Sequence, residues 1–247
     1  MENVCIITGG SRGIGAACVH RAVEAGYDVC FSYVSNADAA QKVVVDVEAA
    51  GGKAIAVQSD VASEADVLKL FEAADAMGTV TGLINNAGIV ARTDRVENYT
   101  YERLERMYGV NVIGSIICAR EAVKRMSTNH GGKGGSIVNL SSAAAYLGSP
   151  NQYVDYAASK AAIDTFTKGL ALEVADEGIR VNAVRPGLID TDIHESGGET
   201  DRVKRLEHMV PMKRGGSADE IAKAVLWLMS DGASYVTGDS INVTGGR

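Results

Sequence analysis

Short apolar runs alternate with longer helical patterns along the chain, and this alternation restricts the fold more than any other feature. Runs that favour β-strands cover 3–8, 28–33, 53–58, 81–85, 136–141, 180–185 and 240–243. Helical patterns lie between them, over 13–25, 37–50, 64–77, 101–126, 153–177 and 218–229. Strands that alternate with helices need crossover connections, which produce a parallel sheet with helices on both faces. The sequence therefore predicts an α/β fold, and because no repeat or linker is visible, one domain is expected over 1–247.

Composition narrows the class of protein. Hydrophobic residues make up 46% of the 247 residues and charged residues 22%, which is usual for a globular chain. The net charge is −7 and the basic residues are scattered, so binding to nucleic acid is not expected. No signal-peptide pattern and no apolar stretch of about 18 residues are visible, so we expect a cytoplasmic protein with no membrane partner.

The cysteines and histidines do not form a metal-binding pattern. The four cysteines (Cys5, Cys18, Cys30 and Cys118) each lie in an apolar run, and no two are spaced as a CxxC pair. Small buried hydrophobic residues explain them better than a redox or metal site. The four histidines are not arranged as a ligand set either, so no metal is predicted.

A glycine-rich loop follows the first predicted strand. It runs from Thr8 to Gly15 as TGGSRGIG and leads directly into a helical pattern. Glycines allow a tight turn and close approach of a pyrophosphate, and the helix start offers free N–H groups and a positive dipole end. The spacing differs from the usual G-x-G-x-x-G, and an ordinary strand-to-helix turn is the alternative. Its place after the first strand favours a dinucleotide.

Two features near this loop favour NADP(H), with NAD(H) still possible. NAD-specific sites usually carry an acid at the end of the second strand, where it binds the ribose 2′-hydroxyl. Here that strand ends at Ser32-Tyr33-Val34, without an acid. Arg12 lies in the glycine loop, where its guanidinium could reach a 2′-phosphate. A solvated loop cation is the alternative for Arg12.

Tyr156 and Lys160 are candidates for proton transfer. Their spacing of four places them on one face of the predicted helix, about one turn apart. A phenol has a pKa near 10, and a nearby ammonium stabilises the phenolate, so we expect Lys160 to lower the pKa of Tyr156. The pair alone is weak evidence, since exposed Tyr and Lys at this spacing are common.

These motifs occur in the order found in the short-chain dehydrogenase/reductase family, which the chain resembles over essentially its full length, and most closely its bacterial NADP(H)-dependent 3-oxoacyl-reductase-like and glucose-dehydrogenase-like members. The matching segments are Thr8–Gly15, Asp60-Val61, Asn85–Gly88, Asn111, Ser142, Tyr156 with Lys160, Pro186-Gly187 with Thr191, Gly238, and Gly245-Gly246. The resemblance implies a Rossmann-type, doubly wound parallel sheet of about seven strands and a hydride-transferring oxidoreductase.

The resemblance also implies the site residues. The catalytic set is Asn111, Ser142, Tyr156 and Lys160. The cofactor-binding set is Gly9, Ser11, Arg12, Gly13, Ile14, Gly15, Tyr33, Asp60, Val61, Asn86, Ala87, Gly88, Tyr156, Lys160, Pro186, Gly187, Ile189 and Thr191. Tyr156 would be the general acid/base, Ser142 would orient the carbonyl, and Asn111 would hold a water that relays protons to Lys160.

Other activities remain open at this point. The same residues serve both directions, so a sugar or alcohol dehydrogenase working by oxidation is an alternative to a carbonyl reductase. A catalytically silent NADP-binding regulator would be expected to lack Tyr156, Lys160 or Ser142, and all three are present. The helices over 101–126 and 153–177 carry more apolar residues than one sheet face needs, and the family pairs such helices, so a homotetramer is expected.

Two segments should shape the substrate site. Ser142 precedes Tyr156 by fourteen residues, one more than is usual, and the extra residue falls in 146–155. Residues 188–216 are polar and are expected to form a lid anchored by 186–191 and 211–216, with a hinge at Gly197-Gly198. Ile193, Met209 and Met212 could give this lid an apolar wall, and a plain exposed loop is the alternative.

Overall fold

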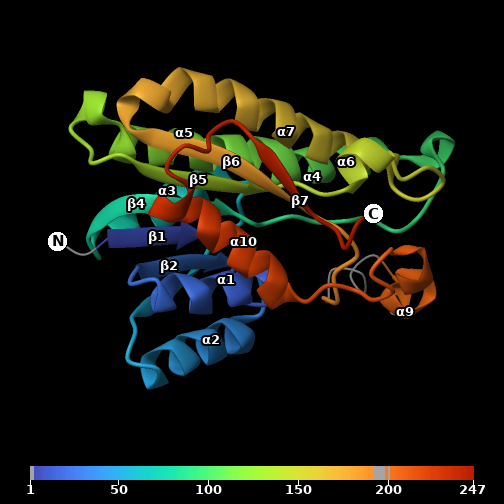
Figure 1. Ribbon diagram of the computed structural model, residues 1–247, viewed down its shortest axis with the longest axis horizontal. Helices are drawn as coiled ribbons and strands as arrows, with labels where there is room; N and C mark the ends of the chain where they lie inside the picture. The colour runs from blue at the N-terminus through green and yellow to red at the C-terminus, as the bar shows by residue number, and fades with distance from the viewer. Residues whose placement is uncertain (1–2, 192–197, 200) are drawn as a thin grey trace.

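The computed structural model describes residues 3–191, 198–199 and 201–247. A parallel sheet forms its centre, with the strand order β3-β2-β1-β4-β5-β6-β7 (Figure 1). The strands are β1 (Asn3–Ile7), β2 (Asp28–Tyr33), β3 (Ala54–Gln58), β4 (Thr79–Asn85), β5 (Gly135–Leu140), β6 (Ile179–Pro186) and β7 (Ser240–Val243). The predicted doubly wound sheet of about seven parallel strands is therefore confirmed.

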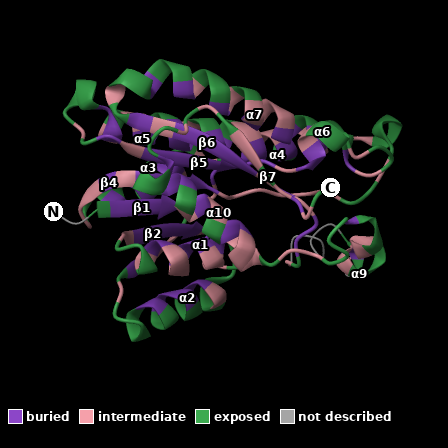
Figure 2. Cartoon of the chain, viewed as in Figure 1, coloured by how far each residue is buried: buried purple, intermediate pink, exposed green. Residues whose placement is uncertain are grey.

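Two layers of helices cover the sheet. On one face lie α1 (Gly13–Glu24), α2 (Ala37–Ala49) and α10 (Ala218–Met229), and their apolar residues share a core with β1, β2 and β6. On the other face lie α3 (Glu64–Asp75), α5 (Ser115–Met126) and α7 (Val154–Val174). Figure 2 shows the central strands buried between these layers, while the outer sides of α2 and α7 are exposed. This double burial explains why strands such as β1 are apolar almost throughout.

The predicted helix over 101–126 is divided into three parts. Helix α4 (Tyr101–Tyr108) continues through one π-helical turn, η2 (Gly109–Gly114), into α5. A π turn widens the helix by one residue and is often found at functional sites. Two short helices, α6 (Ala144–Leu147) and α9 (Arg202–Leu206), were not predicted, because each is only about one turn long. The remaining short 3₁₀ turns are η1 (Val96–Asn98), η3 (Thr128–His130), η4 (Ala175–Glu177), η5 (Glu207–Met209) and η6 (Asp231–Ala233).

The strand order changes direction between β1 and β4. The chain builds outward from β1 to β3 and then returns to place β4 on the other side of β1. Crossovers leave in opposite directions at such a point and open a crevice at the carboxyl ends of the strands, where ligands bind in open α/β sheets. The glycine loop after β1 and the segment after β4 both begin at this edge.

The cysteines are part of the two cores. All four are free and buried, and burial raises the pKa of each thiol, to about 12 for Cys18, Cys30 and Cys118. Thiols in such surroundings stay protonated and inert, as their apolar sequence neighbours suggested. Within the described residues, no helix has both the length and the apolar content to cross a membrane.

Candidate active site

The glycine loop is clamped to the segment that follows β4. The Asn86 side chain donates to the carbonyl oxygens of Thr8 (2.9 Å) and Gly9 (3.0 Å). In return the Thr8 hydroxyl accepts from the backbone N–H groups of Asn86 and Ala87, at 3.0 and 2.9 Å. Two motifs almost 80 residues apart in sequence thus form one rigid unit at the change in strand order.

The loop has the shape and the donors that a pyrophosphate requires. Gly9 and Gly13 have φ values of +68° and +53°, which suit glycine, and a Cβ on Gly15 would lie 2.1 Å from the Gly9 carbonyl oxygen. Helix α1 begins at Gly13 without a side-chain cap and without an acid in its first turn. Its N–H groups therefore suit an anion, and the chain fits a dinucleotide at this place.

The nucleotide groove opens over this loop. It has a volume of about 500 Å³. Its lining includes the predicted residues Gly9, Ser11, Arg12, Gly13, Ile14, Gly15, Tyr33, Asp60, Val61, Asn86, Ala87 and Gly88. Arg12 is exposed and lines the groove together with Tyr33 and Val34 at the neutral end of β2. Arg106, which the sequence analysis missed, also lines the groove and pairs with Asp60 at 2.7 Å.

A second pocket continues from this groove. It has a volume of about 360 Å³ and shares Ile14, Asn86, Gly88 and Thr191 with the groove. Its lining holds the other predicted residues, Ser142, Tyr156, Lys160, Pro186, Gly187, Ile189 and Thr191. One continuous site therefore runs from the end of β2, past the glycine loop, to the start of α7. We call the second pocket the substrate pocket.

Ser142, Tyr156 and Lys160 converge in the substrate pocket. The Ser142 side chain is hydrogen-bonded to the phenol of Tyr156, so the register with one extra residue brings these two side chains together. The Lys160 Nζ lies 5.7 Å from the centre of the Tyr156 ring and donates to the carbonyl oxygen of Leu140 at 2.7 Å. Both side chains are almost fully buried on one face of α7.

Burial dominates the titration of this pair. It raises the pKa of Tyr156 to about 12, against the opposing effect of the Ser142 hydrogen bond. It also lowers the pKa of Lys160 to about 8, although Asp164 acts in the opposite direction. The spacing of the two residues predicts that Lys160 lowers the pKa of Tyr156. The pKa of Tyr156 is raised instead, because burial penalises the charged phenolate more than the hydrogen bond to Ser142 favours it.

Asn111 lies in the π turn and does not line the pocket. Its side-chain oxygen accepts from the Ile89 N–H at 2.8 Å, and its amide donates to the Ile89 carbonyl oxygen at 3.0 Å and to the Ser159 hydroxyl at 3.1 Å. A Cβ built on Gly88 would lie within 3.5 Å of both the Lys160 ammonium and the Asn111 side-chain oxygen. Asn111 therefore joins the segment after β4 to helix α7 directly beneath the lysine.

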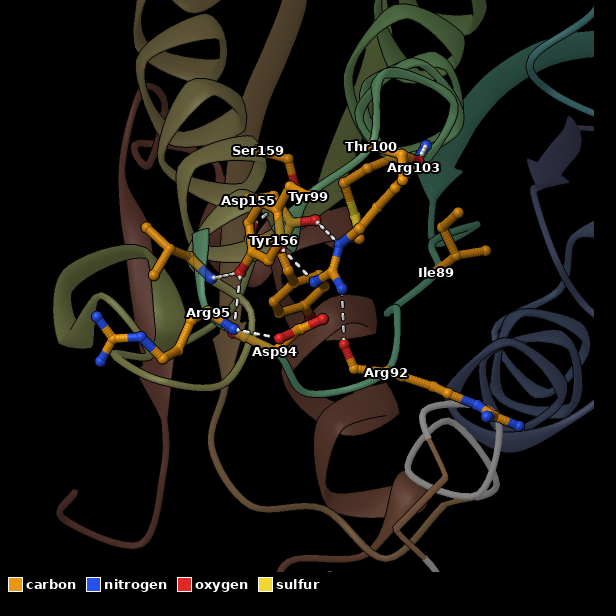
Figure 3. A network of polar contacts seen from close by, with 12 residues as sticks. Ile89, Arg92, Asp94, Arg95, Tyr99, Thr100, Arg103, Asp155, Tyr156 and Ser159 are labelled. Atoms are coloured by element: carbon orange, nitrogen blue, oxygen red, sulfur yellow. Dashed lines mark hydrogen bonds and ion pairs between the residues drawn. The ribbon is translucent and has the colours of Figure 1, made fainter. Parts of the chain in front are cut away.

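A polar network holds the start of α7 (Figure 3). Arg103 on α4 makes a bidentate ion pair with Asp155, at 2.7 and 3.1 Å, and stacks on the Tyr99 ring with its carbon 3.9 Å from the ring centre. The Tyr99 hydroxyl accepts from the first N–H of α7, on Val154, at 3.0 Å. Because Asp155 immediately precedes Tyr156, these contacts fix the helix turn that carries the phenol.

The segment over 188–216 closes at its base. Ile189 and Gly216 form a parallel bridge, in which the Asp190 N–H donates to the Gly216 oxygen and the Gly216 N–H to the Leu188 oxygen, both at 2.9 Å. We call this bridge the neck. It agrees with the predicted anchors at 186–191 and 211–216. The predicted hinge at Gly197-Gly198 falls largely outside the described residues, as does Ile193.

The described part of this segment corrects one expectation. Met209 and Met212 could have given an apolar wall, with a plain exposed loop as the alternative, but both are more than half exposed and neither lines the substrate pocket. Arg202 and Arg247 line it instead, and the sequence analysis named neither. No local pattern marks Arg202, because the residues that contact it on the pocket wall lie about 50 positions earlier in the chain.

Known proteins resemble this chain over nearly its whole length. A family profile described as enoyl-(acyl carrier protein) reductase matches residues 9–247. An uncharacterized oxidoreductase of Escherichia coli, YgfF, is 52% identical over 245 residues, with 99% of each chain covered. A short-chain dehydrogenase/reductase from Serratia marcescens superposes with a TM-score of 0.90 at 34% identity, with 99% of this chain and 97% of that chain covered. A blue fluorescent protein from a metagenomic library, in complex with NADPH, has the same TM-score and coverage at 35% identity.

Proposed function

Because the chain belongs to the short-chain dehydrogenase/reductase family of oxidoreductases, we propose that it transfers a hydride between a nicotinamide cofactor and a carbonyl carbon or secondary alcohol. The observation that supports this activity best is the meeting of Ser142, Tyr156 and Lys160 in a pocket that continues the nucleotide groove. The cofactor supplies or accepts the hydride when it is bound. The protein has to orient the carbonyl and to move one proton.

Tyr156 is the proton donor in the proposed reduction. A phenol whose pKa is raised to about 12 is neutral at physiological pH, so it carries the proton that the developing alkoxide needs. Ser142, which is hydrogen-bonded to Tyr156, would donate to the developing alkoxide and orient the carbonyl. Lys160, with a pKa near 8, is largely an ammonium at neutral pH, and its charge favours the phenolate that remains after transfer. The neutral phenol supports reduction of a carbonyl, and the same residues can serve oxidation of the corresponding alcohol.

The experiment is an assay of aldehydes and ketones, followed by the loss of reduced-cofactor absorbance with NADPH and with NADH. The proposal expects turnover of a carbonyl compound and a preference for NADPH. The corresponding alcohols, assayed with NADP⁺, test the opposite direction. A protein that binds NADPH but turns over no carbonyl and no alcohol would contradict the proposal and favour a regulatory role.

Arg12 carries the proposed preference for NADP(H). Arg12→Ala should weaken NADPH binding about tenfold or more, because a charge-assisted contact to phosphate is lost, and should change NADH binding little. Arg106→Ala is the matched control, since Arg106 lines the same groove but pairs with Asp60 away from the glycine loop. It should affect both cofactors alike. Tighter binding of NADH than NADPH by the unmodified enzyme would overturn this part of the proposal.

We further propose one domain with a substrate lid over 188–216, a homotetramer, and a cytoplasmic location. Apolar side chains are exposed on the helices that the family pairs, including Ile113, Ile116 and Leu172. Symmetric closed assembly is the usual use of such faces. Light scattering should give about four times the chain mass of 25.8 kDa, and a value near the chain mass would contradict the tetramer.

A further inference from the structure

The substrate pocket is cationic beyond the reacting tyrosine. The charged residues that line it are Lys160, Arg202 and Arg247, and no acid is among the described residues of its lining. Much of the remaining wall is apolar, with Val90, Leu147 and Leu188 among its members. A small site with an apolar wall and concentrated positive charge favours a ligand that is itself partly apolar and partly anionic.

Arg202 is a buried cation that is held in a fixed position. Only 8% of the residue is exposed, although it lies on the short helix α9 above the pocket. Its Nη2 donates to the Gln152 side-chain oxygen at 2.7 Å and its Nη1 to Glu199 at 3.0 Å. These bonds engage only part of a guanidinium, which has five N–H donors in a fixed fork. Among the described residues, these contacts orient the side chain in advance and leave guanidinium donors for a ligand.

The neighbouring carboxylate does not neutralise this region. Glu199 is shared between Arg202 and Arg205, so the described residues here leave an excess of positive charge. The pKa of Tyr153 reflects the same balance of charges. Burial raises the pKa of this phenol and Glu199 raises it further, whereas Arg202, Arg247 and Arg205 lower it. A buried cation without full compensation is costly, and a ligand carboxylate would remove much of that cost.

The guanidinium lies one ring away from the reacting phenol. The carbon of the Arg202 guanidinium is 5.1 Å from the centre of the Tyr153 ring, and that ring meets Tyr156 edge-on with 5.6 Å between the ring centres. Arg247 also lines this pocket, and its own backbone oxygen accepts from the Tyr146 hydroxyl. A ligand held by these arginines would therefore have its other end near Ser142 and Tyr156.

We propose that the substrate is an oxo acid, or the corresponding hydroxy acid: a carbonyl or alcohol on a short apolar chain that ends in a carboxylate gripped by Arg202, with Arg247 in support. This inference rests on the proposed function, because it names the substrate class of that same site. The bidentate geometry of a guanidinium matches a carboxylate, and a pocket built to pair such a charge discriminates strongly against the neutral analogue. A purely structural Arg202 would tie α9 to Gln152 and treat acid and ester alike.

The test compares matched acids and esters. The substrates are 2-oxopentanoate, 4-oxopentanoate and 5-oxohexanoate, each with its methyl ester, in the presence of NADPH. Arg202→Met should lower kcat/KM for the preferred acid about 30-fold or more, because one partner of a desolvated charge pair is lost, while the ester changes less than about threefold. Arg205→Met is the control, since Arg205 also bonds Glu199 but is largely exposed and does not line the pocket.

A binding measurement separates this inference from the proposed reaction. Calorimetry with the NADPH-loaded protein should show pentanoate binding about tenfold or more tighter than pentanamide, with the difference lost in Arg202→Met and kept in Arg205→Met. If pentanoate binds in this way but no ketone is reduced, the inference stands and the proposed function fails. If esters are reduced and Arg202→Met leaves kcat/KM for the acids unchanged, the proposed function stands and the inference is overturned. The same conclusion follows if Arg202→Met lowers kcat/KM equally for acids and esters. Equal binding of pentanoate and pentanamide also overturns it.

Discussion

The two sides of the substrate pocket are built differently. On the side that we call the catalytic wall, Ser142 is tied to the start of α6 and Lys160 to β5. Asn111 lies outside the pocket lining and joins α7 to the segment after β4. On the opposite side, the described part of 188–216 is joined by its neck, by the contacts of Arg202 and by the buried side chain of Val210. Proton transfer needs fixed geometry, whereas recognition can change without disturbing the sheet.

The largest effect is expected at the catalytic wall. Tyr156→Phe removes only the phenolic oxygen, so the protein should fold and bind NADPH, but kcat/KM should fall about 10²–10⁴-fold because the proton donor is lost. Tyr153→Phe removes the hydroxyl from the neighbouring ring, whose centre lies 5.6 Å from that of Tyr156, and should reduce kcat/KM no more than about tenfold. Steady-state kinetics of the two variants measure this difference. An equal loss of kcat/KM in both would contradict the special role of the Tyr156 hydroxyl on the catalytic wall.

A large loss of stability is expected where the wall is supported from behind. Arg103→Met leaves the Asp155 carboxylate, 1% exposed, without its cation, which should cost about 3–5 kcal/mol of the free energy of unfolding. Urea denaturation measures this cost. Arg95→Met breaks the exposed pair with Glu97 and should cost less than about 1 kcal/mol. Similar costs for the two variants would show that the Arg103 network does not stabilise the start of α7.

The pH dependence of reduction should follow the ionisation of the Lys160 ammonium. Because burial lowers the pKa of this ammonium to about 8, it is charged below that pH and loses its proton above it. With a substrate that does not titrate, kcat/KM should be level below about pH 8 and fall up to tenfold per unit above it, well before Tyr156 ionises near 12. Circular dichroism at each pH checks that the fold persists. A kcat/KM that stays level to about pH 10 would mean that the charge of Lys160 does not assist the proton transfer.

The smallest effect concerns the neck. Ser217 caps helix α10 directly after Gly216, accepting from the Glu220 N–H while its own N–H donates to the Glu220 carboxylate. Ser217→Ala should cost about 1 kcal/mol locally and speed hydrogen exchange of the Asp190 and Gly216 amides about fivefold. Ser63→Ala removes the same kind of cap from α3, far from the neck, and serves as control. Unchanged exchange at the neck would mean that α10 does not anchor it.

The sequence predicted the sheet well, because buried strands depend on local patterns, while the roles assigned to the catalytic wall stay predictions. Apolar runs mark strands that are buried on both faces, and the motifs place Ser142, Tyr156 and Lys160 at strand and helix ends that the fold brings together. Features that depend on distant partners were missed. No sequence pattern near Arg103 indicates that it will form an ion pair with Asp155, which lies 52 residues later. The direction of the Tyr156 pKa also required the degree of burial, which a spacing of four residues does not reveal.

The neck has a practical consequence for protein engineering. Leu188 and Gly216 lie side by side at the edge of the pocket, so the chain between them starts and ends at nearly one place. Loop-closure entropy grows only slowly with length, so a segment of different length can be grafted between these two points at modest cost. Residues 189–215 can therefore be exchanged as a cassette with those of relatives. If 188–216 acts as the proposed substrate lid, such chimaeras should transfer the substrate preference of a relative to an unchanged catalytic wall.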